Sequence, residues 1–339
     1  MSKVFDMHCD TIGMMHMASI DKKPQQHLSV NNMHIDLVKL QKGNYLAQCF
    51  AMFVPFVEDN PFELCMAMID RFFAEIETNS DFIALATCYD DIMRNEEAGK
   101  ISAILTIEDA CVIQGSLDKL RELFRRGVRM ITLTWNYANG IAFPNFEMPV
   151  EMPLDPKMPP PNMSIPNVDN GLTHFGFELV EEMNRSGIII DVSHLADAGF
   201  WDVAKHSKAP FVASHSNARA CCANVRNLSD DMIRALAEKG GVTGLNYAID
   251  FLRNSDLAQT NHSYLEDMVR HVKHIVNVGG IECIGLGSDF DGIPNNPDLQ
   301  DASYLPRLAH ALNQAGFSEA EIDKIFYQNV LRIFQEVCE

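Results

Sequence analysis

The stretch LTHFGFELVEEMNRSGIIIDVSH, residues Leu172–His194, contains the helix–strand unit from which the architecture is predicted. Its first part, Leu172–Ser186, has a helical pattern, and Gly187 is typical of the residue that ends a helix. The following run, Gly187–Val192, is apolar and β-branched, which predicts a buried strand. A helix that passes directly into a buried strand is the building unit of α/β proteins with a parallel sheet.

The same alternation extends along the whole chain. Apolar runs predict eight strands, at Val4–His8, Leu46–Val54, Ile101–Ile107, Val128–Thr134, Gly187–Val192, Pro210–Ser214, Gly241–Leu245 and Glu282–Leu286. Helices are predicted between most of them, at Pro61–Thr78, Ser116–Arg125, Leu172–Ser186, Ser229–Glu238, Ser263–Val278 and Ala302–Gln314. Eight strands close a (β/α)8 TIM barrel, so we predict one α/β barrel domain over residues 1–339. Two extra C-terminal helices in Ser318–Glu339 are expected to pack outside the barrel.

The composition of the 339-residue chain is that of a globular protein, with 47% hydrophobic and 22% charged residues. The formal net charge of −19 disfavours nucleic acid and anionic membranes as partners, because both would be repelled. No apolar run is long enough for a transmembrane helix, and the first residues lack the apolar stretch of a signal peptide. The nine cysteines include no Cys-x-x-Cys pair. These features favour a cytoplasmic protein with reduced thiols.

A proline-rich segment interrupts the pattern. Residues Pro144–Pro166 contain eight of the fifteen prolines, which excludes a helix or a central strand there. The segment follows the fourth predicted strand at its C-terminal end, where barrel enzymes place their active sites. Two interpretations stay open: a plain surface loop, or a loop at the active-site face that walls or covers the pocket.

Side chains that can bind metal ions follow the predicted strands. They are His8 and Asp10 after the first strand, Glu108 after the third, His194 after the fifth, His215 after the sixth and Asp289 after the eighth. One histidine at a strand end is ordinarily a packed polar residue, but this set would gather on one face of a barrel. Three imidazoles with carboxylates suit zinc or a similar divalent ion, and three carboxylates allow a site for two ions. The other nine histidines are expected on the surface or as hydrogen-bonded core residues.

Signatures of several other enzyme classes are absent from the sequence. It contains no Gly-x-Ser-x-Gly, no Gly-x4-Gly-Lys-[Ser/Thr], no Gly-x-Gly-x-x-Gly and no His-Glu-x-x-His. Their absence argues against serine hydrolases, P-loop proteins and metzincin-like metalloproteases.

Six short phrases, taken together, resemble the renal (membrane) dipeptidase family of the amidohydrolase superfamily. They are FDMHCD (Phe5–Asp10), IEDA (Ile107–Ala110), ITLTW (Ile131–Trp135), DVSH (Asp191–His194), SHSNA (Ser214–Ala218) and GSDFDG (Gly287–Gly292). The match runs in order from residue 4 to about residue 334, and Leu172–His194 is a long contiguous part of it. The resemblance implies a metal-dependent hydrolase barrel and a metallopeptidase that hydrolyses dipeptides, including those with a C-terminal D-residue. It also suggests a homodimer.

The resemblance implies a role for each candidate site residue. By the family pattern, two zinc ions are held by His8, Asp10, Glu108, His194 and His215, with Glu108 bridging them. The expected nucleophile is a hydroxide between the two ions. Asp289 is expected to transfer protons. Arg226, in the sequence NVRNL, matches the arginine that holds the substrate carboxylate, and Asn246 is also assigned to substrate binding.

The sequence departs from the family pattern at Trp135. Dipeptidases of the mammalian kind carry a histidine there, which helps to bind substrate, whereas tryptophan has a single N–H donor. Either the metal ions take over more of the stabilisation, or Trp135 forms a different pocket with Asn136 or Asn139. Three hypotheses therefore stay open: a zinc dipeptidase, an N-acyl-amino-acid hydrolase or lactonase on the same barrel, and a non-catalytic binding protein. The last would have lost metal ligands, and none is missing.

Overall fold

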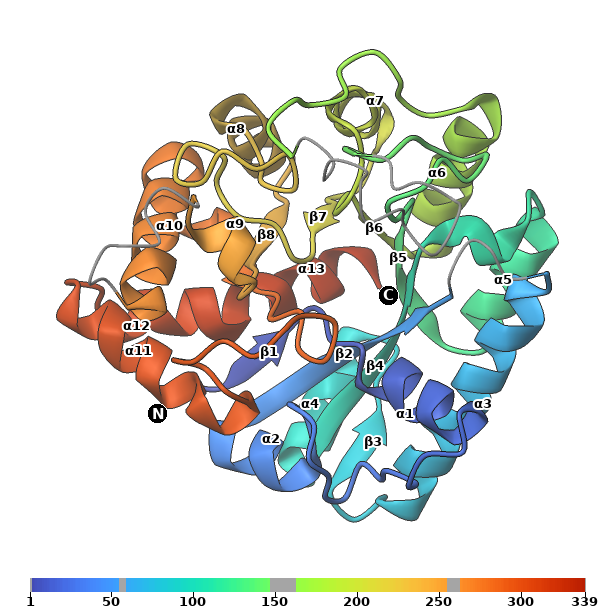
Figure 1. Cartoon of the computed structure of the whole chain (residues 1–339), viewed down its shortest axis with the longest axis vertical. Helices are drawn as coiled ribbons and strands as arrows, with labels where there is room; N and C mark the ends of the chain where they lie inside the picture. Colours follow the sequence, from blue (N-terminus) through green and yellow to red (C-terminus); the bar gives the residue numbers. More distant parts are fainter. Residues whose placement is uncertain (1, 55–58, 147–162, 255–262, 339) are drawn as a thin grey trace, which may run out of the picture.

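The computed structural model describes residues 2–54, 59–146, 163–254 and 263–338, and its strands form a closed parallel barrel (Figure 1). The strands are β1 Val4–Asp6, β2 Tyr45–Phe53, β3 Ile83–Leu85, β4 Ile101–Glu108, β5 Val128–Thr132, β6 Ile189–Asp191, β7 Val212–Ala213, β8 Val242–Leu245 and β9 Ile284–Leu286. The ring runs β1, β2, β4, β5, β6, β7, β8, β9, and the pairing of β9 with β1 closes it. The predicted TIM barrel is therefore confirmed, with all eight of its strands.

Strand β3 is the one strand of the described chain that the sequence analysis missed. Its three residues pair with the start of β4, from Ile101 to Ala103, outside the ring of eight. Three residues are too few to display the period-two pattern on which a prediction depends.

Helices surround the barrel (Figure 1). They are α1 Thr11–Ile20, α2 Leu37–Gly43, α3 Pro61–Thr78, α4 Tyr89–Glu97, α5 Leu117–Arg125, α6 His174–Ser186, α7 Asp197–His206, α8 Asp230–Glu238, α9 Ile249–Leu252, α10 Tyr264–Gly279, α11 Leu305–Gln314, α12 Glu319–Asp323 and α13 Asn329–Val337. All six predicted helices are present, and α3 has the predicted bounds. Within the described ranges, no helix is both long and apolar enough to cross a membrane.

The predicted helix–strand unit forms as α6 and β6. Thr173 caps the helix by accepting a hydrogen bond from the Gly176 backbone N–H at 3.1 Å. Gly187 ends the helix with a φ of 72°, a left-handed conformation that glycine adopts without a side-chain clash. In the strand, Ile190 faces the helices while Ile189 faces the barrel interior. Because of this alternation, the Asp191 side chain also points into the barrel, directly below the candidate active site.

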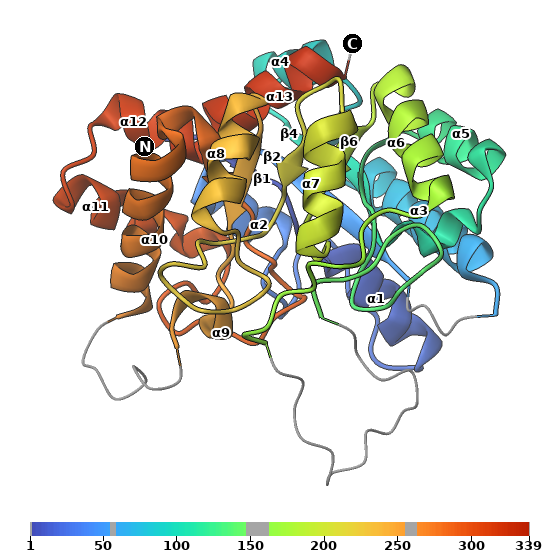
Figure 2. The same cartoon turned by 90° about the horizontal axis from the view of Figure 1, so that it is seen from above.

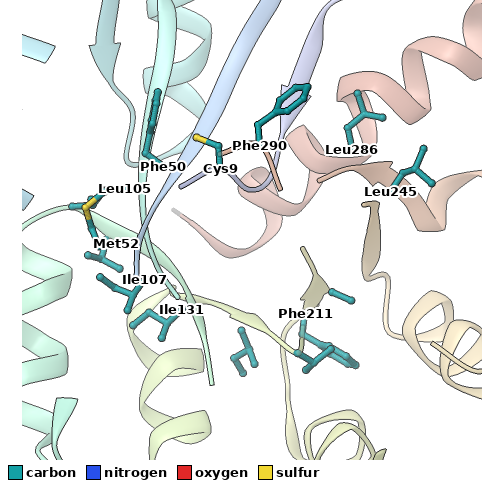
Figure 3. Close-up of a cluster of buried hydrophobic side chains, with 14 of the residues drawn as sticks. Cys9, Phe50, Met52, Leu105, Ile107, Ile131, Phe211, Leu245, Leu286 and Phe290 are labelled. Carbon is teal, nitrogen blue, oxygen red and sulfur yellow. The ribbon is translucent and has the colours of Figure 1, made fainter. Parts of the chain in front are cut away.

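Two apolar layers hold the barrel together. Figure 3 shows part of the outer layer, in which Phe50, Leu105 and Ile131 extend from neighbouring strands. The inner layer fills the N-terminal end of the barrel, where Phe334 of α13 packs on Phe5 with ring centroids 5.2 Å apart. Helix α13 thus covers one end of the barrel, and the loops after the strands lie at the opposite end (Figure 2).

Candidate active site

The metal-capable side chains meet at the C-terminal end of the barrel, with Glu108 at their centre. Glu108 Oε1 lies 3.1 Å from His194 Nε2 and 3.6 Å from His215 Nε2. Its other oxygen, Oε2, lies 3.7 Å from His8 Nε2. One carboxylate from β4 therefore reaches imidazoles that follow β1, β6 and β7.

His8 connects this cluster to a second group of carboxylates. His8 Nε2 lies 3.3 Å from Asp10 Oδ2 and 4.0 Å from Asp289 Oδ1. Donor atoms of His8, Glu108 and His215 all lie within 4.8 Å of one another. The same is true of donor atoms of His8, Asp10 and Asp289. Five of the six residues expected to converge fall in these two overlapping groups, and His194 joins them through its 3.1 Å approach to Glu108.

The cluster has the electrostatic character of a cation site. Burial alone would lower the pKa of His8, but the carboxylates of Glu108 and Asp10 outweigh burial and raise that pKa to about 10. Burial, assisted by the charge of Asp10, raises the pKa of Asp289 to about 6 and that of Glu108 well above its ordinary value. His8 Nε2 is buried without a hydrogen-bond partner. A divalent ion would neutralise these carboxylates and use that nitrogen, so the residues fit a metal.

Hydrogen bonds orient the other two imidazoles. His194 Nδ1 lies 2.8 Å from Asn136 Oδ1, which can only accept, so Nδ1 carries the proton and Nε2 carries the lone pair. His215 Nδ1 lies 2.7 Å from Ser214 Oγ, and Ser214 in turn donates to Asp191 Oδ2 at 2.6 Å. Burial lowers the pKa of both histidines well below the ordinary value. Both rings are therefore neutral and present Nε2 to Glu108, the form in which imidazole binds a metal.

The backbone is strained at two of the site residues. His194 has a φ of 68° and Asp289 a φ of 61°, in the left-handed region that non-glycine residues seldom occupy. Such conformations cluster at functional sites, where the surrounding structure holds them in place.

Arg226 lies inside the cluster. Its Nη2 donates to His194 Nε2 at 2.8 Å, and its side chain packs over the ring of Phe251 with the guanidinium carbon 5.3 Å from the ring centroid. Burial lowers the pKa of Arg226 to about 10, against the opposing charges of Asp289 and Glu108. The single lone pair of His194 Nε2 can accept from Arg226 or bind a cation, so a bound ion would release the guanidinium toward the cavity.

Asn246, which was expected to bind substrate, lies behind the site. Its side chain is fully buried, and Nδ2 donates to Asp289 Oδ2 at 2.9 Å and to the His215 carbonyl at 3.1 Å. Asn246 Oδ1 accepts from the Ala248 backbone N–H at 2.7 Å. Asn246 is not among the residues that line the cavity, and its contacts are those of a residue that positions Asp289.

A cavity of about 800 Å³ opens above the cluster. Its wall includes the site residues Asp10, Glu108, His194, Arg226 and Asp289, and also Gly13, Met14, Met17, Phe53, Trp135, Asn136, Phe146, Met163, Asn224, Asp250, Phe251, Asp291, Gly292 and Ile293. The wall includes many apolar side chains that the sequence analysis did not assign to the site.

Trp135 lies in this wall. Its ring centroid is 4.8 Å from that of Phe53 and 6.0 Å from that of His194. Asn139 stands behind the wall, where it donates to Asp109 and accepts from the backbone N–H groups of the following turn. Asn136 therefore shares the pocket with Trp135, while Asn139 supports its loop.

The two described ends of the proline-rich segment reach the cavity. Phe146 and Met163 line it, and the Val225 backbone N–H donates to the Met163 carbonyl at 2.7 Å. Residues 147–162 of the segment lie outside the described residues. Its predicted role at the active-site face stays a prediction.

Known proteins resemble this chain over 74–99% of its length. The profile of the membrane dipeptidase family (peptidase family M19) matches residues 1–339. An uncharacterised protein in the pqqA 5′ region of Klebsiella pneumoniae is 35% identical over 249 residues, covering 74% of this chain and 87% of its own. An uncharacterised dipeptidase of Schizosaccharomyces pombe is 30% identical over 353 residues, covering 99% and 80%. A metallopeptidase from Rhodobacter sphaeroides, solved with a phosphinate mimic of L-Ala-D-Ala, has a TM-score of 0.87 at 26% identity over 99% of both chains.

Proposed function

Because this chain belongs to the membrane dipeptidase family, peptidase family M19, we propose that it hydrolyses dipeptides with two divalent ions, most naturally Zn²⁺. His8, Asp10, Glu108, His194 and His215 would hold the ions, with Glu108 between them. The observation that carries this proposal is the position of Glu108, whose two oxygens approach three imidazole nitrogens within 3.1–3.7 Å. A packing role would not require so many metal-binding atoms at one buried point.

Bound divalent ions would polarise the scissile carbonyl and lower the pKa of a water molecule to roughly 7. The protein supplies the remaining chemistry. Asp289 takes the proton from the attacking water and passes it to the leaving amine. Asn246 holds Oδ2 of this carboxylate at 2.9 Å, which leaves Oδ1 for the transfer.

Arg226 selects the substrate by its charge. Its guanidinium lines the cavity and can pair with a free C-terminal carboxylate through two parallel hydrogen bonds. A longer peptide could not place its carboxylate there while its scissile bond reaches the metal cluster, so two residues are the natural length. The Rhodobacter metallopeptidase, which binds a mimic of L-Ala-D-Ala, supports a dipeptide with a C-terminal D-residue as one substrate class.

A second candidate function follows from Trp135. An indole in place of a histidine makes the wall beside His194 more apolar, which would also suit an N-acyl-amino-acid hydrolase or a lactonase. The test is a substrate panel on protein of known metal content, with L-L dipeptides, L-D dipeptides, N-acyl amino acids and lactones. We expect cleavage of dipeptides at the highest kcat/KM. Cleavage confined to acylated amino acids or lactones would replace the first proposal with the second.

A further inference from the structure

The cavity has two walls of different chemistry, on opposite sides of the barrel axis. Arg226 belongs to the loop after β7, and Phe53 ends β2. In the ring of eight strands, β7 and β2 are four strands apart in either direction, so they face each other across the barrel. The metal-capable cluster, centred on Glu108, lies between them.

The wall on the β2 side is apolar. Phe53 and Trp135 form an aromatic pair with centroids 4.8 Å apart, and Phe53 is in register with Glu108 on the neighbouring strand. Met14 and Met17 add two thioethers from α1. They lie four and seven positions after Asp10, so the helix presents all three on one face.

This arrangement fixes the direction in which a dipeptide would lie. With its C-terminal carboxylate at Arg226 and its scissile carbonyl at the metal cluster, the N-terminal residue extends toward β2. Its side chain then contacts Met14, Phe53 and Trp135. A charged or hydroxyl side chain would lose hydration there, whereas an apolar one would be stabilised by burial. Methionines adapt their shape to different apolar groups.

We propose that this wall is the subsite for the N-terminal residue and that the enzyme prefers dipeptides with a large apolar residue there. This inference rests on the proposed function. Leucine, methionine and phenylalanine are the expected residues. Arg226 and the metal cluster select the dipeptide as a class, and the wall of Met14, Met17, Phe53 and Trp135 selects among dipeptides.

The test measures kcat/KM for dipeptides that share a C-terminal glycine and differ only at the first residue. The apolar group is Leu-Gly, Met-Gly and Phe-Gly, and the polar group is Ser-Gly, Asp-Gly and Lys-Gly. We expect the apolar group to exceed the polar group by roughly ten- to a hundred-fold. Phosphinate mimics of Leu-Gly and Ser-Gly should inhibit in the same order, which gives a readout of binding.

Two variants and one control assign the preference to the wall. Met14→Ser and Phe53→Ser should each lower the ratio of kcat/KM for Leu-Gly over Ser-Gly by several-fold. Met14 is 50% exposed, so its replacement is compatible with the fold even if Phe53→Ser is not. Ile20→Ser is the matched control, because Ile20 lies on the same helix, is 55% exposed and does not line the cavity. It should leave the ratio unchanged.

The outcomes separate this inference from the function on which it rests. If metal-loaded protein cleaves no dipeptide, the proposed function is overturned and the inference with it. If it cleaves dipeptides with no preference for apolar first residues, or if Met14→Ser and Phe53→Ser both keep the wild-type ratio, only the subsite is overturned.

Discussion

At the scale of single residues, hydrogen bonds made by Nδ1 decide which nitrogen of His194 and of His215 faces the site. His215 Nδ1 bonds to Ser214 Oγ at 2.7 Å, and Ser214 Oγ in turn donates to the Asp191 carboxylate at 2.6 Å. Asp191 Oδ2 also accepts from Thr132 Oγ1 at 2.6 Å. An anchored carboxylate at the end of such a chain strengthens the imidazole as a ligand.

We therefore expect Ser214→Ala to weaken metal binding by roughly ten- to a hundred-fold, because His215 Nδ1 loses its acceptor. A competition titration with a chelator measures the dissociation constant of Zn²⁺. Metal-free stability, followed by urea unfolding, separates this effect from general destabilisation. An unchanged dissociation constant would contradict the orienting role of Ser214.

Asp289→Asn should abolish proton transfer while leaving the metal in place, because the amide keeps the shape of the carboxyl group but cannot serve as a base. We expect kcat to fall by about two to four orders of magnitude. Zinc content by elemental analysis is the control, and it should match that of the wild-type protein. Turnover near the wild-type rate would remove Asp289 from the mechanism.

Arg226→Ala should impair substrates with a free carboxylate far more than their amides. We expect kcat/KM for a dipeptide to fall by roughly a hundred-fold or more, since a charge-assisted pair is lost. The comparison uses the same dipeptide with an amidated C-terminus. An equal loss on both substrates would assign Arg226 a structural role.

At the scale of secondary-structure elements, buried carboxylates tie neighbouring strands together beneath the site. Asp191 Oδ1 accepts from the backbone N–H groups of Ser193 and Ser214, at 2.9 and 2.8 Å, and so joins the ends of β6 and β7. Asp6 Oδ1 joins β1 and β9 in the same way, by accepting from Ser288 at 2.8 Å. The elements that carry His8, His194, His215 and Asp289 are thereby fixed in position.

His271 joins helix α10 to the loop after β7 and to the last residue of α9. Its Nδ1 accepts from the Ala218 backbone N–H at 3.1 Å, and its Nε2–H donates to the Leu252 carbonyl at 3.0 Å. Burial lowers the pKa of His271 to about 4. The unfolded chain, with a pKa near 6.5, binds the proton more readily, so stability falls as the pH drops from about 6.5 to 4.

His271→Gln should therefore reduce the pH dependence of the free energy of unfolding by an amount on the order of 3 kcal/mol between pH 6.5 and 4. Urea unfolding at a series of pH values measures this. His310→Gln, at an exposed position on α11, is the control and should keep the wild-type dependence. Equal pH dependence in wild-type protein and His271→Gln would contradict a neutral, buried His271.

Some helices were easier to predict from the sequence than others, and the difference has a physical cause. Helix α3 begins with a proline at its first turn and alternates apolar with charged residues, so its pattern was clear. Helix α1, with the sequence TIGMMHMASI, has no charged residue and no polar face, so no amphipathic pattern marks it. For this reason no helix was predicted there, Met14 and Met17 were not assigned to the site, and the apolar wall of the cavity was missed.

At the scale of the whole molecule, closure of the barrel explains why the site could be predicted from a linear sequence. Residues as distant as His8 and Asp289 meet because each follows a strand of the same ring. The strands themselves were predictable because both of their faces are buried. Contacts that depend on side-chain orientation could not be predicted. Asn246 illustrates this, because the strand that precedes it was predicted and its contact with Asp289 was not.

The most direct test is a crystal structure of the zinc-loaded protein, with anomalous scattering to locate the ions and elemental analysis to count them. We expect two ions, about 3.5–4 Å apart, bound by His8, Asp10, Glu108, His194 and His215 with Glu108 between them. Protein that retains no zinc, or ions bound away from Glu108, would contradict this expectation.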